Sequence, residues 1–137
     1  MALTHLLDTS VLTRLREPTV REAIEEWAQR GELARAGISD LEIGFSARNA
    51  AEWERLADAM EVFELVESTA EHVRRARQAQ RLLASKHQRG RKVPDLLVAA
   101  AAEARSLTVL HYDADFDLIA DVTGQSCRWV VPAGSID

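Results

Sequence analysis

The stretch PDLLVAAAAEARSLTVLHYDADFDLIA, residues 94–120, predicts a helix, a strand and a second helix in one continuous run. Pro94 and Asp95 suit a first helical turn, because proline lacks an N–H that would go unpaired there and a carboxylate favours the positive end of the helix dipole. The alanine-rich segment that follows predicts a closely packed helix, and residues 107–110 predict a short strand ending before Asp113. Such a run is typical of an α/β domain.

The rest of the chain continues this alternation. Strands are predicted at 2–7, 33–38, 62–66 and 128–131, and helices after Asp8, at 19–31, from Ser39, at 50–60 and at about 69–86. Parallel strands need crossover connections, usually helices, so the order of elements predicts an α/β fold with a mostly parallel sheet.

Length and composition are those of one globular domain spanning residues 1–137. Hydrophobic residues make up 47% and charged residues 28%, which argues against extensive disorder. The lone Cys127 cannot form an internal disulfide, and the first apolar run is short and interrupted by Asp8. We therefore expect a cytoplasmic protein without a membrane segment. Trp27, Trp53 and Trp129 fit apolar stripes or strands and are predicted to lie in the core.

The cations are concentrated in one segment. Eight of the 17 Lys and Arg residues lie between His72 and Lys92 with no acid among them, which leaves 9 positive against 22 negative residues, or −13, elsewhere. This distribution favours contact with phosphates over a merely solvated helix face. The candidate nucleic-acid-binding residues are Arg74, Arg77, Arg81, Lys86, Arg89, Arg91 and Lys92.

Four isolated acids fall near predicted junctions between strands and helices: Asp8, Glu42, Asp95 and Asp113. Singly, each has a structural explanation, for example a capping box of Ser39 with Glu42, or a helix cap at Asp8. As a set they suggest a shared site, because strand ends of an open α/β sheet converge at one edge. The HYDADFD sequence around Asp113 adds further charge through Asp115 and Asp117.

Converged carboxylates would need a cation. Two of them about 4 Å apart repel by roughly 4 kcal/mol at an effective dielectric constant near 20. The chain has no Cys or His pair at metal spacing, so an oxygen-only site predicts Mg²⁺, with Mn²⁺ as a substitute, rather than zinc. His111 adjoins the acidic turn, but a single histidine at a strand end is more often a surface or hydrogen-bonded residue than a catalytic one.

The chain resembles the PIN-domain ribonucleases, and within them the VapC type of bacterial toxin. The likeness covers nearly the whole chain and is carried by LLDTSVL at 6–12, SDLEIG at 39–44 and the 94–120 stretch. It implies a three-layer α/β/α fold and Mg²⁺-dependent endonucleolytic cleavage of structured RNA, such as transfer or ribosomal RNA, that inhibits translation. It also implies a VapB-type antitoxin as partner and a homodimer.

The resemblance also implies roles for individual residues. Asp8, Glu42, Asp95 and Asp113 match the four acidic catalytic positions of the family, and Asp115 is an additional contributor to the metal site. Thr9 and Ser10 match small hydroxyl residues that support the first acid. Asp8 and Asp95 are expected to be direct ligands, Asp113 a ligand directly or through water, and Glu42 a ligand or an orienter of the attacking water. His111 replaces the Thr or Ser found in many members.

Other functions fit less well. A haloacid-dehalogenase-like phosphotransferase would need a second acid where Ser10 stands, and a receiver domain would need a late lysine, yet no lysine follows Lys92. The alternative from another class is a catalytically silent RNA-binding or regulatory module of the same fold. Metal-dependent cleavage that is lost on substitution of the acids separates the two.

Overall fold

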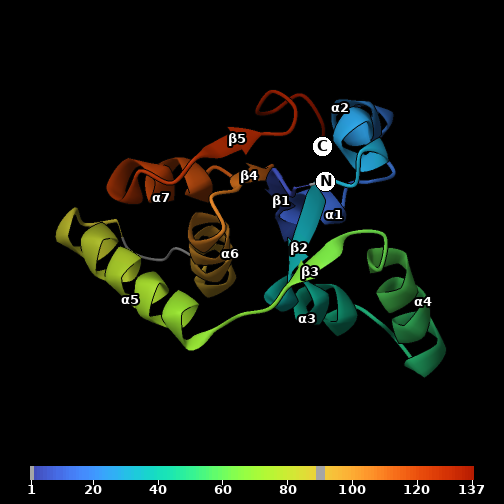
Figure 1. The fold of residues 1–137 in the computed structure, drawn as a ribbon, viewed down its shortest axis with the longest axis horizontal. Coiled ribbons are helices and arrows are strands. Elements are labelled where there is room, and N and C mark those ends of the chain that lie inside the picture. Colours follow the sequence, from blue (N-terminus) through green and yellow to red (C-terminus); the bar gives the residue numbers. More distant parts are fainter. Residues whose placement is uncertain (1, 89–91) are drawn as a thin grey trace.

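A computed structural model describes residues 2–88 and 92–137. The strands form one sheet of five in the order β3-β2-β1-β4-β5, and each neighbouring pair is parallel. The strands are β1 His5–Leu7, β2 Leu33–Ala36, β3 Glu64–Val66, β4 Thr108–His111 and β5 Cys127–Trp129. The helices are α1 Thr9–Leu12, α2 Pro18–Gln29, α3 Gly37–Phe45, α4 Ala50–Met60, α5 Ala70–Ser85, α6 Val93–Ala104 and α7 Asp115–Thr123 (Figure 1).

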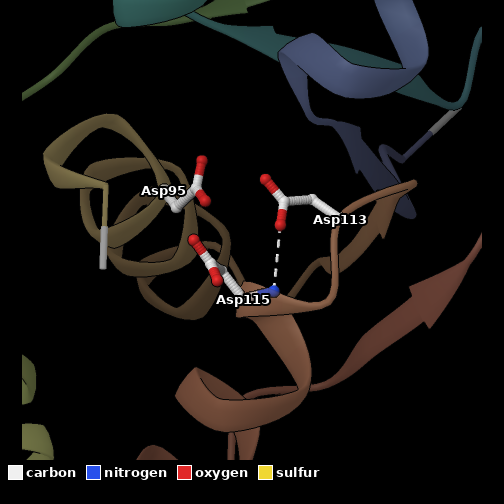
Figure 2. Close-up of side chains that lie close together, drawn as sticks. All are labelled: Asp95, Asp113 and Asp115. Atoms are coloured by element: carbon white, nitrogen blue, oxygen red, sulfur yellow. Dashed lines mark hydrogen bonds between the residues drawn. The ribbon is translucent and has the colours of Figure 1, made fainter. Parts of the chain in front are cut away.

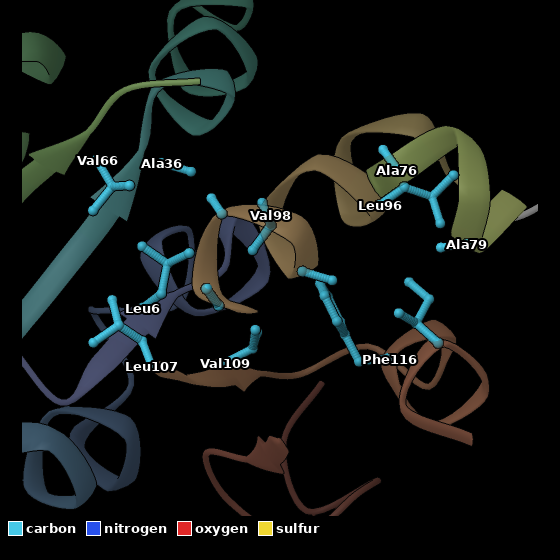
Figure 3. Close-up of a cluster of buried hydrophobic side chains, with 14 of the residues drawn as sticks. Leu6, Ala36, Val66, Ala76, Ala79, Leu96, Val98, Leu107, Val109 and Phe116 are labelled. Atoms are coloured by element: carbon cyan, nitrogen blue, oxygen red, sulfur yellow. The ribbon is translucent and has the colours of Figure 1, made fainter. Parts of the chain in front are cut away.

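Helices cover both faces of the sheet because successive side chains of each strand point to opposite faces. Leu6 packs in a cluster with residues of α5, α6 and α7, whereas its neighbour Leu7 packs in a second cluster with residues of α1, α2 and α3. Val109 and Leu110 of β4 divide in the same way. Figure 3 shows the first cluster, with Phe116 of α7 packed toward α6. The predicted three-layer α/β/α fold with a parallel sheet is confirmed.

The strands lie where the sequence predicts them; four of them are shorter, and β4 has the predicted length but is shifted by one residue. The helices agree closely. One correction concerns α3, which begins at Gly37 after Ala36, so Ser39 lies inside the helix. The predicted capping box of Ser39 with Glu42 is therefore wrong. Ser39 is fully buried, and its hydroxyl is hydrogen-bonded to Thr9 Oγ1 at 2.8 Å. Ser39 thus makes a tertiary contact with Thr9 instead of the local helix cap that the sequence predicted.

The prediction that the three tryptophans lie in the core is wrong for Trp53, whereas Trp27 packs at the edge of the second cluster. Trp53 is exposed and packs over Gly44, where an added Cβ would lie only 2.5 Å from the indole nitrogen. Trp27 and Trp129 are only partly buried. The indole N–H of Trp129 donates to Asp117 at 3.2 Å, as expected of a side chain with one polar atom.

A buried arginine sets the position of α3. Arg35 of β2 is 4% exposed, and its guanidinium donates to the carboxylate of Asp40 in α3 at 2.8 and 3.2 Å. It also donates to the carbonyls of Met60 and Phe63, which precede β3. This network satisfies the buried charge and fixes the helix that carries Glu42.

Within the described ranges, no helix has the length and apolar character needed to cross a bilayer.

The central strand should dominate stability. Leu6 is fully buried, so we expect Leu6→Ala to lower the free energy of unfolding by about 3 kcal/mol through lost burial and a residual cavity. Leu41→Ala is the matched control, because Leu41 is 70% exposed and its truncation should cost within about 0.5 kcal/mol. Urea unfolding followed by circular dichroism measures both; equal losses would contradict the assigned core.

Candidate metal centre

Three aspartates from separate elements meet at the carboxyl edge of the sheet. Asp95 lies in the first turn of α6, Asp113 follows β4, and Asp115 begins α7. One carboxylate oxygen from each lies within 4.8 Å of the others (Figure 2). Carboxylates this close repel one another strongly unless a proton or a cation lies among them.

The turn after β4 is held by its own backbone. The N–H of Asp115 donates to Asp113 Oδ1 at 2.9 Å, as the dashed line in Figure 2 shows. The other oxygen of Asp113 accepts from Lys92 Nζ at 2.7 Å. The N–H of Asp113 donates to His111 Nδ1 at 3.3 Å. Asp113 is therefore fixed from three directions.

Asp8 lies at the end of β1 and serves as the N-cap of α1, as one structural explanation predicted. Its side chain is buried, and Oδ2 accepts from the backbone N–H of Ser10 at 3.0 Å and from the Ser10 hydroxyl at 2.6 Å. The Ser10 oxygen in turn accepts from the N–H of Tyr112 at 2.8 Å. Ser10 thus joins the first acid to the chain that leads into Asp113.

Glu42 stands beside this group rather than in it. Its Oε1 accepts from Thr9 Oγ1 at 2.7 Å, and it is absent from the three-aspartate cluster found among the described residues. Its charge nevertheless contributes to raising the pKa of Asp8. The structure therefore brings Asp95, Asp113 and Asp115 together, with Asp8 and Glu42 as electrostatic neighbours.

The pKa values show how much negative charge is crowded here. Burial, followed by the charges of Asp8 and Asp113, raises the pKa of Asp95 to about 8. Burial likewise raises the pKa of Asp8, against the hydrogen bonds from Ser10. For Asp113, burial acts to raise the pKa, but hydrogen bonds from Lys92 and from the Asp115 backbone outweigh it and hold the pKa low.

His111 is fully buried, so the expectation of a surface histidine is wrong and that of a hydrogen-bonded one is correct. Its ring stacks on Phe116 at 4.9 Å and lies 5.0 Å from the ring of Trp129. Burial lowers its pKa, which favours the neutral ring. Since Nδ1 accepts a hydrogen bond, the proton belongs on Nε2, and the histidine supports the backbone of the Asp113 turn.

The chemistry of this site fits a divalent cation. Asp8 Oδ1 and Asp95 Oδ2 are buried and have no hydrogen-bond partner among the described residues, although buried carboxylate oxygens are usually satisfied. The donors are carboxylate oxygens, the ligands of hard ions such as Mg²⁺. Of the described residues, Asp95, Asp113 and Asp115 form the group that could hold such an ion, and Asp8 borders it.

The basic segment is partly neutralised in the fold. Arg74, Arg75 and Lys86 pair with Glu71, Glu103 and Asp121, respectively. Arg77 and Arg81 have no carboxylate partner among the described residues and line an open surface of α5. Arg89 and Arg91, which were predicted to bind RNA, lie outside the described residues.

Comparison with known proteins identifies the family. The family model of the PIN domain matches residues 5–122. Ribonuclease VapC51 of Mycobacterium tuberculosis is 64% identical over 137 residues, with 100% of both chains covered. The chain belongs to the VapC-type PIN-domain ribonucleases. Ribonuclease VapC21 of the same organism is 40% identical, over 98% of this chain and 99% of its own.

A solved structure supports the PIN fold independently. In the crystal structure of DNA-bound VapBC from Salmonella typhimurium, the matching chain superposes with a TM-score of 0.77. The match covers 94% of this chain and 99% of that one at 18% sequence identity. At that identity the likeness establishes the shared fold.

Several contacts at this PIN-domain site were not predicted from the sequence. Tyr112 reaches Ser10 across a separation of 102 residues, and Ser39 contacts Thr9 instead of capping a helix. Lys92 was assigned to RNA but contacts Asp113. The Tyr112 contact uses a backbone N–H, so no side-chain pattern in the sequence signals it.

The raised pKa of Asp95 predicts a stability profile for the metal-free protein. Because a folded pKa of about 8 exceeds the ordinary 3.8, the folded chain binds more protons in this range. The free energy of unfolding therefore falls as pH rises from about 4 to 8. We expect wild type to lose roughly 10 °C more in Tm than Asp95→Asn between pH 5 and pH 8.5.

Thermal unfolding in EDTA measures this difference, and titratable groups distant from Asp95 cancel in the comparison. Parallel profiles for wild type and Asp95→Asn would contradict the shifted pKa. Saturating Mn²⁺ at pH 8.5 should raise the Tm of wild type more than that of the variant, because a ligand stabilises the state that binds it.

Proposed function

We propose that this chain is a Mg²⁺-dependent endoribonuclease that cleaves structured RNA, such as transfer or ribosomal RNA, and thereby inhibits translation. The observation that carries the proposal is the convergence of Asp95, Asp113 and Asp115 within 4.8 Å, beside unpartnered buried oxygens of Asp8 and Asp95. Such a site favours a hard divalent ion, and the names of the relatives indicate RNA as the substrate. Mn²⁺ should substitute for Mg²⁺.

The acidic residues have different proposed roles, metal ligation or orientation of water, according to their positions. Asp8, Asp95, Asp113 and Asp115 offer carboxylate oxygens to the ion. When bound, Mg²⁺ would lower the pKa of water and offset charge that develops on the scissile phosphate. Glu42 borders the group on the Asp8 side, where its carboxylate can orient the attacking water. Thr9 holds Glu42 and Ser10 holds Asp8 through hydroxyl hydrogen bonds.

The RNA backbone would contact the basic face of α5. Arg77 and Arg81 are exposed, and no carboxylate in the part of the chain that the structure describes pairs with them. Their guanidinium groups are therefore available to phosphates. The remaining surface carries an excess of acids, which would repel RNA elsewhere. Unpaired bases in a loop are the natural sequence-specific target.

The partner we propose is a VapB-type antitoxin, with the chain acting as the toxin of the pair in the cytoplasm and assembling as a homodimer. The proposal is supported by the relatives' VapC names and by a structural neighbour that is a VapBC complex. Removal of the antitoxin would release the nuclease.

Cleavage tests the central proposal. Purified chain, free of any partner, should cut end-labelled transfer or ribosomal RNA into discrete fragments with Mg²⁺ and leave it intact with EDTA. Asp95→Asn should lower the rate by more than the roughly 10- to 100-fold that loss of a supporting residue costs. Asp121→Asn, on the exposed side of α7, is the matched control and should retain cleavage. Stoichiometric RNA binding without fragments would favour a catalytically silent binding module.

Ser10 offers a separate test of the metal site. Ser10→Ala removes the hydroxyl that donates to Asp8 and accepts from Tyr112, so we expect Mn²⁺ affinity to fall roughly 10- to 100-fold. Thr13→Ala, which alters an exposed hydroxyl at the end of the same helix, should leave it unchanged. Isothermal titration calorimetry measures both affinities; an unaltered Ser10→Ala value would remove Ser10 from the site.

A further inference from the structure

Among the described residues, Lys92 is the cation that contacts the aspartate cluster. Its ammonium lies 2.7 Å from Asp113 Oδ2, while its side chain remains 62% exposed. The partner carboxylate is 16% exposed, so the lysine reaches inward from the solvent. The hydrogen bond to Asp113, followed by the charges of Asp113, Asp95 and Asp115, raises the pKa of Lys92. It is therefore fully charged at neutral pH.

The contact competes with a divalent ion. Asp113 Oδ1 accepts from the Asp115 backbone, and Lys92 holds the other potential ligand oxygen of this carboxylate, Oδ2. A cation that binds there must displace the ammonium or accept its repulsion. Lys92 directly precedes α6, is exposed and sits on a flexible four-carbon side chain, so it can turn away without disturbing the core.

We propose that Lys92 is an exchangeable counter-ion of the nuclease site: it neutralises Asp113 in the metal-free protein, yields to the divalent ion, and then contacts the RNA phosphate at the point of cleavage. This inference rests on the proposed function. The displaced ammonium remains next to the acids, where the negative group that arrives is the phosphate of the substrate. A lysine is suited to this exchange because it is a compact charge with three freely rotating donors.

The chain supplies its own control. Its only lysines are Lys86 and Lys92, and both pair with an aspartate. Lys86 meets Asp121 at 3.4 Å on α7, outside the aspartate cluster, and is about as exposed as Lys92. Lys86→Gln therefore makes the same change in charge and side-chain type without touching the proposed metal ligands.

The first measurement is Mn²⁺ affinity by isothermal titration calorimetry without RNA. Lys92→Gln should bind Mn²⁺ roughly two- to fivefold more tightly than wild type, the factor that corresponds to an exposed ion pair. Lys86→Gln should bind as wild type does. Circular dichroism establishes that each variant is folded. Equal affinity for Lys92→Gln and wild type would overturn the exchange.

The second measurement follows the lysine itself in wild type. Brief labelling with acetic anhydride, read by peptide mass spectrometry, should show Lys92 becoming roughly two- to fivefold more reactive when Mn²⁺ is added. Lys86 in the same molecule should not change. Constant reactivity of Lys92 at saturating Mn²⁺ would show that the ion does not displace it and would overturn the proposal.

The third measurement is RNA cleavage at saturating Mg²⁺. Lys92→Gln should raise KM about tenfold or more through the lost charged hydrogen bond, although its metal affinity improves. Lys92→Arg should restore a KM near that of wild type. Opposite changes in metal affinity and KM distinguish exchange from a merely structural ion pair, and an unchanged KM would overturn the phosphate contact.

Failure of the proposed function has a different signature. If wild type binds no Mn²⁺ and cleaves no RNA, the metallonuclease proposal fails and the role of Lys92 fails with it. If wild type binds metal and cleaves, while Lys92→Gln matches it in both affinity and KM, the proposed function stands and the exchange alone is wrong.

Discussion

Burial of carboxylates at one edge of the sheet is the constraint on which the site depends. Asp8 and Asp95 are only 2% and 4% exposed, and each has one oxygen that no group in the described part of the chain hydrogen-bonds. Burying a charge without pairing it is costly, so the surroundings must compensate. Ser10 satisfies the other oxygen of Asp8, and Lys92 neutralises Asp113. The remaining carboxylate oxygens of Asp8 and Asp95 are suited to ligate a metal ion.

The parallel sheet makes this crowding unavoidable. β1 and β4 are neighbours at its centre, so residues that follow them leave at the same edge although they are more than a hundred positions apart. The N–H of Asp8 donates to the carbonyl of Leu110 at 2.9 Å, so the pairing of β1 with β4 continues up to Asp8 itself. Clusters of apolar side chains on both faces hold these strands in register. Stability of the core and geometry of the acids are therefore linked.

The basic segment is less positively charged in the fold than its sequence indicates, because acids from other helices pair with part of it. In sequence it is free of acids, but in the fold Glu103 of α6 and Asp121 of α7 reach back to Arg75 and Lys86. Part of the positive charge thus joins α5 to the helices beside it. The cations left without described carboxylate partners, Arg77 and Arg81, form a narrower surface than the sequence indicated.

The sequence by itself determined the order of the elements and the parallel arrangement of the strands. These features follow from periodicity, which is local. Only the tertiary structure decided that Ser39 contacts Thr9, that His111 is buried, and that Lys92 lies on Asp113. Such contacts depend on which side chain arrives from a distant segment. Local patterning predicts what a residue can do, whereas packing decides which partner it meets.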